Sequence, residues 1–77
     1  MAAGAVVAIG DPARLRGYAL AGVTVVPATS PAGARAAWRA LGADVAVVVL
    51  TRPAAAAIGP VTGPLPMLAV LPEAAGP

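Results

Sequence analysis

Val6-Val7-Ala8-Ile9-Gly10-Asp11-Pro12 is the stretch that decides how the rest of this chain folds. Its apolar run ends at Gly10, which predicts a buried strand that stops before a sharp turn. Asp11 and Pro12 then form a strong helix start, because an aspartate accepts from the free N–H groups of a first turn and a proline needs no partner there. The expected opening unit is therefore strand, turn and helix.

The helix that follows is expected over residues 12–21, and Gly22 stands where a left-handed residue would end it. Gly17 lies inside this helix, where a glycine costs about 1 kcal/mol relative to alanine. Two interpretations of Gly17 stay open: a glycine tolerated in an alanine-rich and glycine-rich chain, or a place where another backbone comes close. The helix has one apolar stripe with helical spacing, formed by Leu15, Tyr18 and Ala19.

The rest of the chain repeats the alternation of strand and helix. Ser30 before Pro31 repeats the helix-start signal, and Trp38 is expected to anchor the core from the second helix. The run 45–50 is apolar without alternation, which suits a central parallel strand. The remaining elements are expected as strands at 23–26 and 67–71 and helices at 31–41 and 53–58.

Strands that alternate with helices through short connectors indicate a parallel sheet with right-handed crossovers. The most apolar strands, the first and third, belong in its centre. The sequence therefore predicts one α/β domain over residues 1–77, a flavodoxin-like or receiver-like sandwich with a four-stranded parallel sheet in the order 2-1-3-4. Helices are expected on both faces, and residues 73–77 are expected to be a frayed tail.

The composition excludes several classes of function. With 77 residues, no cysteine and no histidine, the chain offers no disulfide, zinc site or Cys- or His-based catalysis. Its net charge of +2 comes from scattered arginines, which argues against nucleic acid as a partner. The strongly apolar run 45–50 is far shorter than the roughly twenty residues of a spanning helix, and the first residues lack a signal-peptide pattern. We expect no cofactor, no membrane insertion and a cytoplasmic location.

A polar crevice is expected where the first and third strands end, because ligands of open parallel sheets bind at such a point. Asp11, Thr51 and Arg52 would meet there. The structural interpretation competes with a site, since Asp11 and Thr51 also suit helix capping and Arg52 suits solvent. A dinucleotide fingerprint is absent after Ile9.

A receiver-like regulatory domain and a small-ligand-binding domain are the alternatives that this topology leaves open. A receiver domain would need a second acid beside Asp11, an acceptor aspartate where the chain has Leu50-Thr51, and a lysine, which the sequence lacks. With three acidic residues in the whole chain, acid–base pairs have few candidates and no catalytic residue is expected.

Two segments together carry a resemblance to a known family. Ile9-Gly10-Asp11 and the segment Gly-Tyr-Ala-Leu-Ala-Gly-Val at 17–23 resemble the F subunit of the V-type/A-type ATP synthase (ATPase), which shows an Ile-Gly-Asp start and a Gly-aromatic-X-Leu-Ala-Gly-Val segment. The similarity continues more weakly through the second helix and the strands at 45–51 and 66–72. That family continues into a C-terminal helix, so the resemblance implies a C-terminally shortened member.

The resemblance implies a non-catalytic central-stalk subunit of a rotary proton pump, bound to the coiled-coil D subunit of the rotor and to other subunits of the head. It would lie in the cytoplasm, peripheral to the membrane through the complex, and ATP would bind on neighbouring subunits. The motif positions carried over as structural or rotor-contact residues are Gly10, Asp11, Gly17, Tyr18, Leu20 and Gly22.

Overall fold

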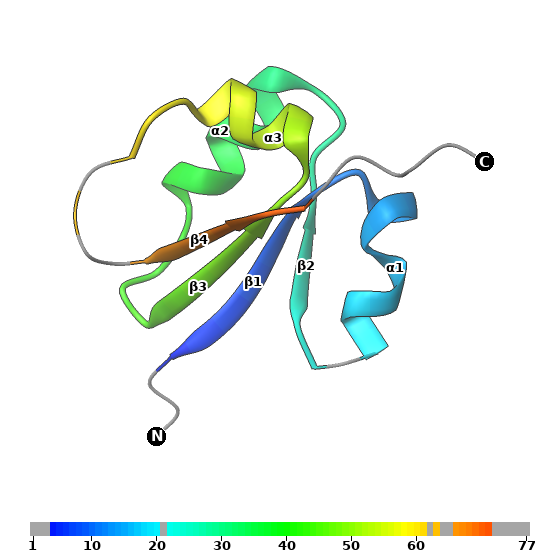
Figure 1. Ribbon diagram of the computed structural model, residues 1–77, viewed down its shortest axis with the longest axis vertical. Coiled ribbons are helices and arrows are strands. Elements are labelled where there is room, and N and C mark those ends of the chain that lie inside the picture. Colours follow the sequence, from blue (N-terminus) through cyan, green and yellow to red (C-terminus); the bar gives the residue numbers. More distant parts are fainter. Residues whose placement is uncertain (1–3, 21, 62, 64–65, 72–77) are drawn as a thin grey trace.

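The computed structural model describes residues 4–20, 22–61, 63 and 66–71. Within them, strands and helices alternate along the chain: β1 (Ala5–Gly10), α1 (Pro12–Leu20), β2 (Thr24–Pro27), α2 (Pro31–Arg39), β3 (Val45–Leu50), α3 (Arg52–Ile58) and β4 (Met67–Val70). The strands form one all-parallel sheet in the order β2-β1-β3-β4, which confirms the predicted fold class and topology (Figure 1).

The element boundaries differ from the predicted ones by one or two residues. The sequence predicts a second strand that ends before Pro27, but Pro27 pairs with Gly10 as the last residue of β2. A proline is tolerated there because β2 is an edge strand, whose outer side needs no ladder donors. Helix α2 ends at Arg39, two residues earlier than expected, with Ala40 as its C-cap.

The main core lies between the sheet and the pair formed by α2 and α3. Alternate residues of the two central strands face this pair, so Val7 and Ile9 of β1 lie beside Val48 and Leu50 of β3. The side chains that α2 and α3 contribute to this core are small: they are the buried residues Ala34, Ala37 and Ala54. Trp38 is partly buried and packs against this cluster, as expected of a core anchor.

The opposite face of the sheet is covered over only part of its width. Helix α1 packs against β1 and β2, where Leu15 and Ala8 are fully buried (Figure 1). No helix of the described residues covers β3 and β4 on this side. The register leaves an uncovered group of apolar residues there, which we call the open face: Val47, Val49, Met67 and Ala69.

Candidate functional site

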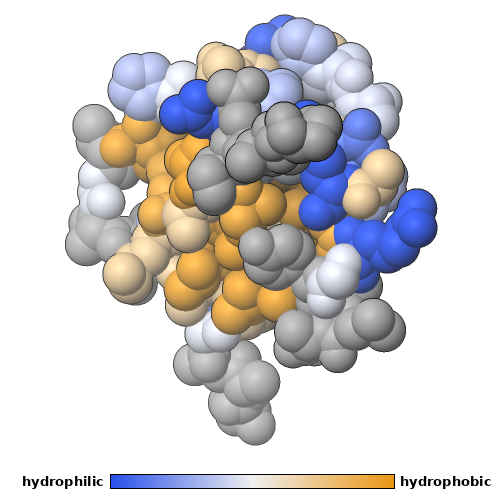
Figure 2. Space-filling view, turned by 45° about the vertical axis from the view of Figure 1, so that its right-hand side comes forward, coloured by the Kyte–Doolittle hydropathy of each residue, from blue (hydrophilic) through white to orange (hydrophobic). Residues whose placement is uncertain are grey.

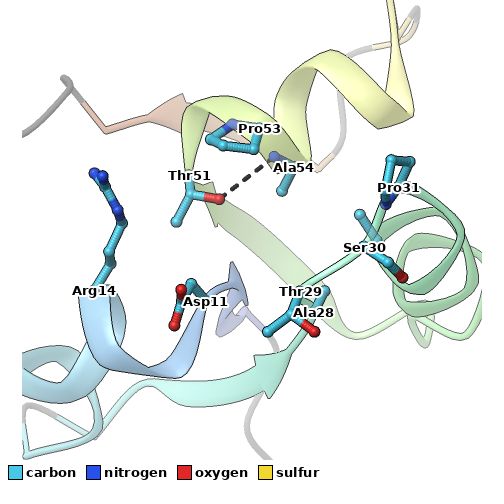
Figure 3. Close-up of a pocket in the computed structure, with 10 residues that line it drawn as sticks. Asp11, Arg14, Ala28, Thr29, Ser30, Pro31, Thr51, Pro53 and Ala54 are labelled. Carbon is cyan, nitrogen blue, oxygen red and sulfur yellow. Dashed lines mark hydrogen bonds between the residues drawn. The ribbon is translucent and has the colours of Figure 1, made fainter.

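A cavity of about 300 Å³ lies at the carboxyl ends of β1, β2 and β3. This is the point between β1 and β3 at which an open parallel sheet changes its winding direction. The polar side chains that line the cavity come from three strand-to-helix connections and from the first turn of α1: Asp11, Arg14, Thr29, Ser30 and Thr51 (Figure 3). The predicted crevice is therefore present.

The three helices begin at this cavity, and each is capped by a side-chain oxygen that lines it. Asp11 Oδ1 accepts from the backbone N–H of Ala13 at 2.9 Å. Ser30 Oγ accepts from the N–H at position 33 at 3.0 Å, and Thr51 Oγ1 accepts from the N–H at position 54 at 3.4 Å. Each bond satisfies a donor that the first turn of a helix leaves free. Helix starts thus account for these oxygens without a ligand, which confirms the capping interpretation of Asp11 and Thr51.

Of the two expectations for Arg52, a contribution to this crevice is wrong, whereas its exposure agrees with the structural interpretation. Arg52 is the exposed first residue of α3 and does not line the cavity. The guanidinium at the cavity belongs to Arg14, whose side chain extends from α1 toward the start of α3 (Figure 3). Sequence reasoning missed Thr29 and Ser30 as lining residues, although the helix-start signal at Ser30 follows β2 and so lies at the same edge of the sheet.

Gly10, the last residue of β1, lies in close contact with the side chain of Thr51. A Cβ on Gly10 would lie 2.9 Å from the Cβ of Thr51 and still closer to its Oγ1 and Cγ2. Thr51 is 4% exposed, and its N–H donates to the Ile9 carbonyl at 3.2 Å. The absence of a side chain at position 10 therefore lets the ends of the two central strands approach each other.

The other motif residues lie along α1 and just after it. Gly17 is exposed, and a Cβ there would meet no atom of the described residues within 4 Å outside its own helix backbone. Gly22 has a φ of +85°, the left-handed conformation that the sequence predicts. Tyr18 and Leu20 lie in the last turn of α1, and their side chains are outside the described residues. The assignment of these positions to partner contacts stays a prediction.

We expect Gly17→Ala to stabilise the isolated chain by about 0.5–1 kcal/mol, because alanine is the better helix former and the added methyl group meets open space. That gain would raise the Tm by a few degrees for a domain of this size. Thermal unfolding followed by circular dichroism measures it. Gly22→Ala is the matched control and should lower the Tm, since its positive φ disfavours a side chain. A lower Tm for Gly17→Ala would contradict the open environment at this position.

The fold and the crevice define a small doubly wound α/β domain. The polar side chains at the carboxyl edge of its sheet cap the helices that begin there. The family model described as ATP synthase (F/14-kDa) subunit matches residues 6–74 of the chain. The chain therefore belongs to this family, and it is a subunit of the V/A-type ATP synthase class. No curated protein and no solved structure matches the chain. None of the described helices has the length and apolar character needed to cross a membrane.

Proposed function

We propose that this chain is a non-catalytic central-stalk subunit of a V/A-type ATP synthase, which helps to couple ATP hydrolysis or synthesis to proton transport. The observation that carries this proposal is the family match over residues 6–74. Its partners would be the coiled-coil D subunit of the rotor and other subunits of the soluble head. In this proposal the chain is cytoplasmic and is held near the membrane through the complex.

The chemistry of the crevice supports a role without catalysis. Each helix is capped by a side-chain oxygen of this crevice, from Asp11, Ser30 or Thr51. These oxygens already accept hydrogen bonds from backbone N–H groups. Among the described residues, the lining contains a single carboxylate, that of Asp11, whereas general acid–base work on a substrate usually needs two matched groups. The end of β3 carries Leu50 and Thr51 where a receiver domain would carry its acceptor aspartate.

Co-expression with the coiled-coil rotor protein of the same complex tests the proposal. We expect one peak on size-exclusion chromatography that contains both chains at micromolar concentration, and no ATP hydrolysis by the isolated chain. Two separate peaks at that concentration would overturn the stalk assignment. A thermal-shift measurement with nucleotides addresses the ligand-binding alternative, for which a nucleotide-dependent rise in Tm would be the supporting result.

A further inference from the structure

We propose that the open face and the adjoining side of α1 form the docking surface for one amphipathic α-helix that carries acidic residues beside its apolar stripe. This inference rests on the proposed function, in which the partner is a coiled-coil protein, and it adds which surface of the chain the coiled coil contacts. The proposed occupant of this surface is a helix of another protein.

The open face is apolar and accessible to a partner. Met67 is 63% exposed and Ala69 is exposed, while Val47 and Val49 of the adjacent strand are partly buried. None of these residues carries a charge. Figure 2, which brings the α1 side forward, shows apolar residues that form a broad surface bordered by hydrophilic residues on the right. Met67 is the exposed large hydrophobic residue of β4 on this face, whereas Leu68 and Val70 lie on the opposite face.

The shape of the uncovered area favours a helix. A parallel sheet is normally covered by helices on both faces. Here α2 and α3 lie side by side over β1, β2 and β3 on one face, and α1 covers only β1 and β2 on the other (Figure 1). Two neighbouring strands are about 10 Å wide with their side chains, and a helix has a diameter of about 10–12 Å. One helix placed beside α1 would therefore complete the incomplete layer.

The charge of Arg14 favours an acidic partner. Arg14 lies on α1 and extends away from β2 toward the start of α3, on the side of the uncovered strands (Figure 3). It is exposed, and no ion pair joins it to the acids of the described residues, Asp11 and Asp44. The open face of a second copy carries no charge, so it offers no complementary group to Arg14. An acidic residue on a partner helix would supply one.

Gly17 adds an independent argument for contact along α1. It lies three residues after Arg14, so the two positions are neighbours on one side of the helix. Among the described residues, no atom outside its own helix backbone lies within 4 Å of the place of its missing side chain, and its φ is not positive. Neither packing nor backbone geometry in this part of the chain therefore requires a glycine here. Because Gly17 has no side chain, the surface of α1 beside Arg14 is flat there, which allows a helix of a partner to come close.

The test uses the purified coiled-coil rotor protein as the probe and compares its affinity for variants of this chain by titration calorimetry. We expect Met67→Glu to weaken binding by at least about tenfold, because a charge would enter an apolar interface. Val70→Glu is the matched control: it makes the same change on the same strand, at a side chain that is 51% exposed and faces the α2 side. Its affinity should stay within about twofold of the unchanged chain.

Charge reversal tests the proposed attraction between Arg14 and acidic residues of the partner helix. Arg14→Glu should weaken binding several-fold and reduce its dependence on salt, whereas Arg35→Glu on the exposed surface of α2 should do neither. Circular dichroism confirms that each variant is folded.

The outcomes separate the docking surface from the proposed function. Failure of the unchanged chain to bind the coiled coil would overturn the stalk assignment and this inference together. Binding that Met67→Glu and Val70→Glu weaken equally would leave the stalk assignment in place and overturn the docking surface. A dimer of the chain alone that Met67→Glu dissociates, seen by light scattering, would show that a second copy occupies the open face and would also overturn the inference.

Discussion

Gly10→Ala is expected to destabilise the chain by roughly 2–4 kcal/mol, through overpacking and backbone strain together. The new Cβ would collide with the side chain of Thr51, whose Cβ lies 2.9 Å from the position it would occupy. Thr51 cannot retreat easily, because it is buried, caps α3 and donates its N–H to Ile9. The φ of +154° at Gly10 is a further cost for any residue with a side chain. Urea unfolding followed by circular dichroism measures the loss.

Gly59→Ala separates the steric effect from the backbone effect. Gly59 also has a positive φ, +80°, but a Cβ there would meet no atom of the described residues within 4 Å. Its substitution should therefore cost only the backbone strain, about 1–3 kcal/mol. If Gly10→Ala were no more destabilising than Gly59→Ala, close approach of β1 and β3 would not be the reason for the glycine in the Ile9-Gly10-Asp11 segment.

The sheet could be predicted from the sequence because its signals are local. The uninterrupted apolar runs of β1 and β3 indicate central strands, and both lie in the centre of the sheet. The same pattern predicts cover on both faces, and this part is wrong for β3, because no helix of the described residues packs on the side of Val47 and Val49. The Asp-Pro and Ser-Pro pairs at 11–12 and 30–31 mark helix starts through hydrogen bonds that span two or three residues. Such short-range chemistry is readable without knowledge of the tertiary structure.

The composition of the crevice was harder to predict, because it depends on where side chains point. Sequence position places both Arg14 and Arg52 near the carboxyl edge of the sheet, one in the first turn of α1 and the other at the start of α3. Only the orientation of α1 on the sheet decides that Arg14 lines the cavity. That orientation is set by burial of Leu15, a tertiary contact that helical spacing suggests but does not fix.

The exposure of β4 could not be predicted for a similar reason. Its residues are as apolar as those of a buried strand, so the run 67–71 indicates a strand without indicating what covers it. In the structure all four residues of β4 are exposed, and β4 pairs with β3 alone. An apolar strand at an open edge is a liability in a free protein, which favours a chain that works inside an assembly.

Ile9→Ala is expected to have an effect of similar size through the opposite defect, a cavity. Ile9 of β1 is fully buried between the sheet and the α2–α3 pair, and removal of such a side chain costs about 2–5 kcal/mol. The value should lie toward the upper end, because the helical residues of this core are alanines, which are too short to move into the space. A small domain with total stability near the lower end of about 5–15 kcal/mol would then be largely unfolded on mild warming.

Urea unfolding of Ile9→Ala beside Val70→Ala checks this argument about the alanine-lined core. Val70 is 51% exposed at the edge of the sheet, so its truncation removes little buried surface and should cost below about 1 kcal/mol. If the chain binds the coiled-coil rotor protein as proposed, that binding should partly restore the Tm of Ile9→Ala, because a partner that binds only the folded state stabilises it by mass action. Equal losses for the two variants would mean that the core between the sheet and α2 relaxes freely, and that its alanines do not limit repacking.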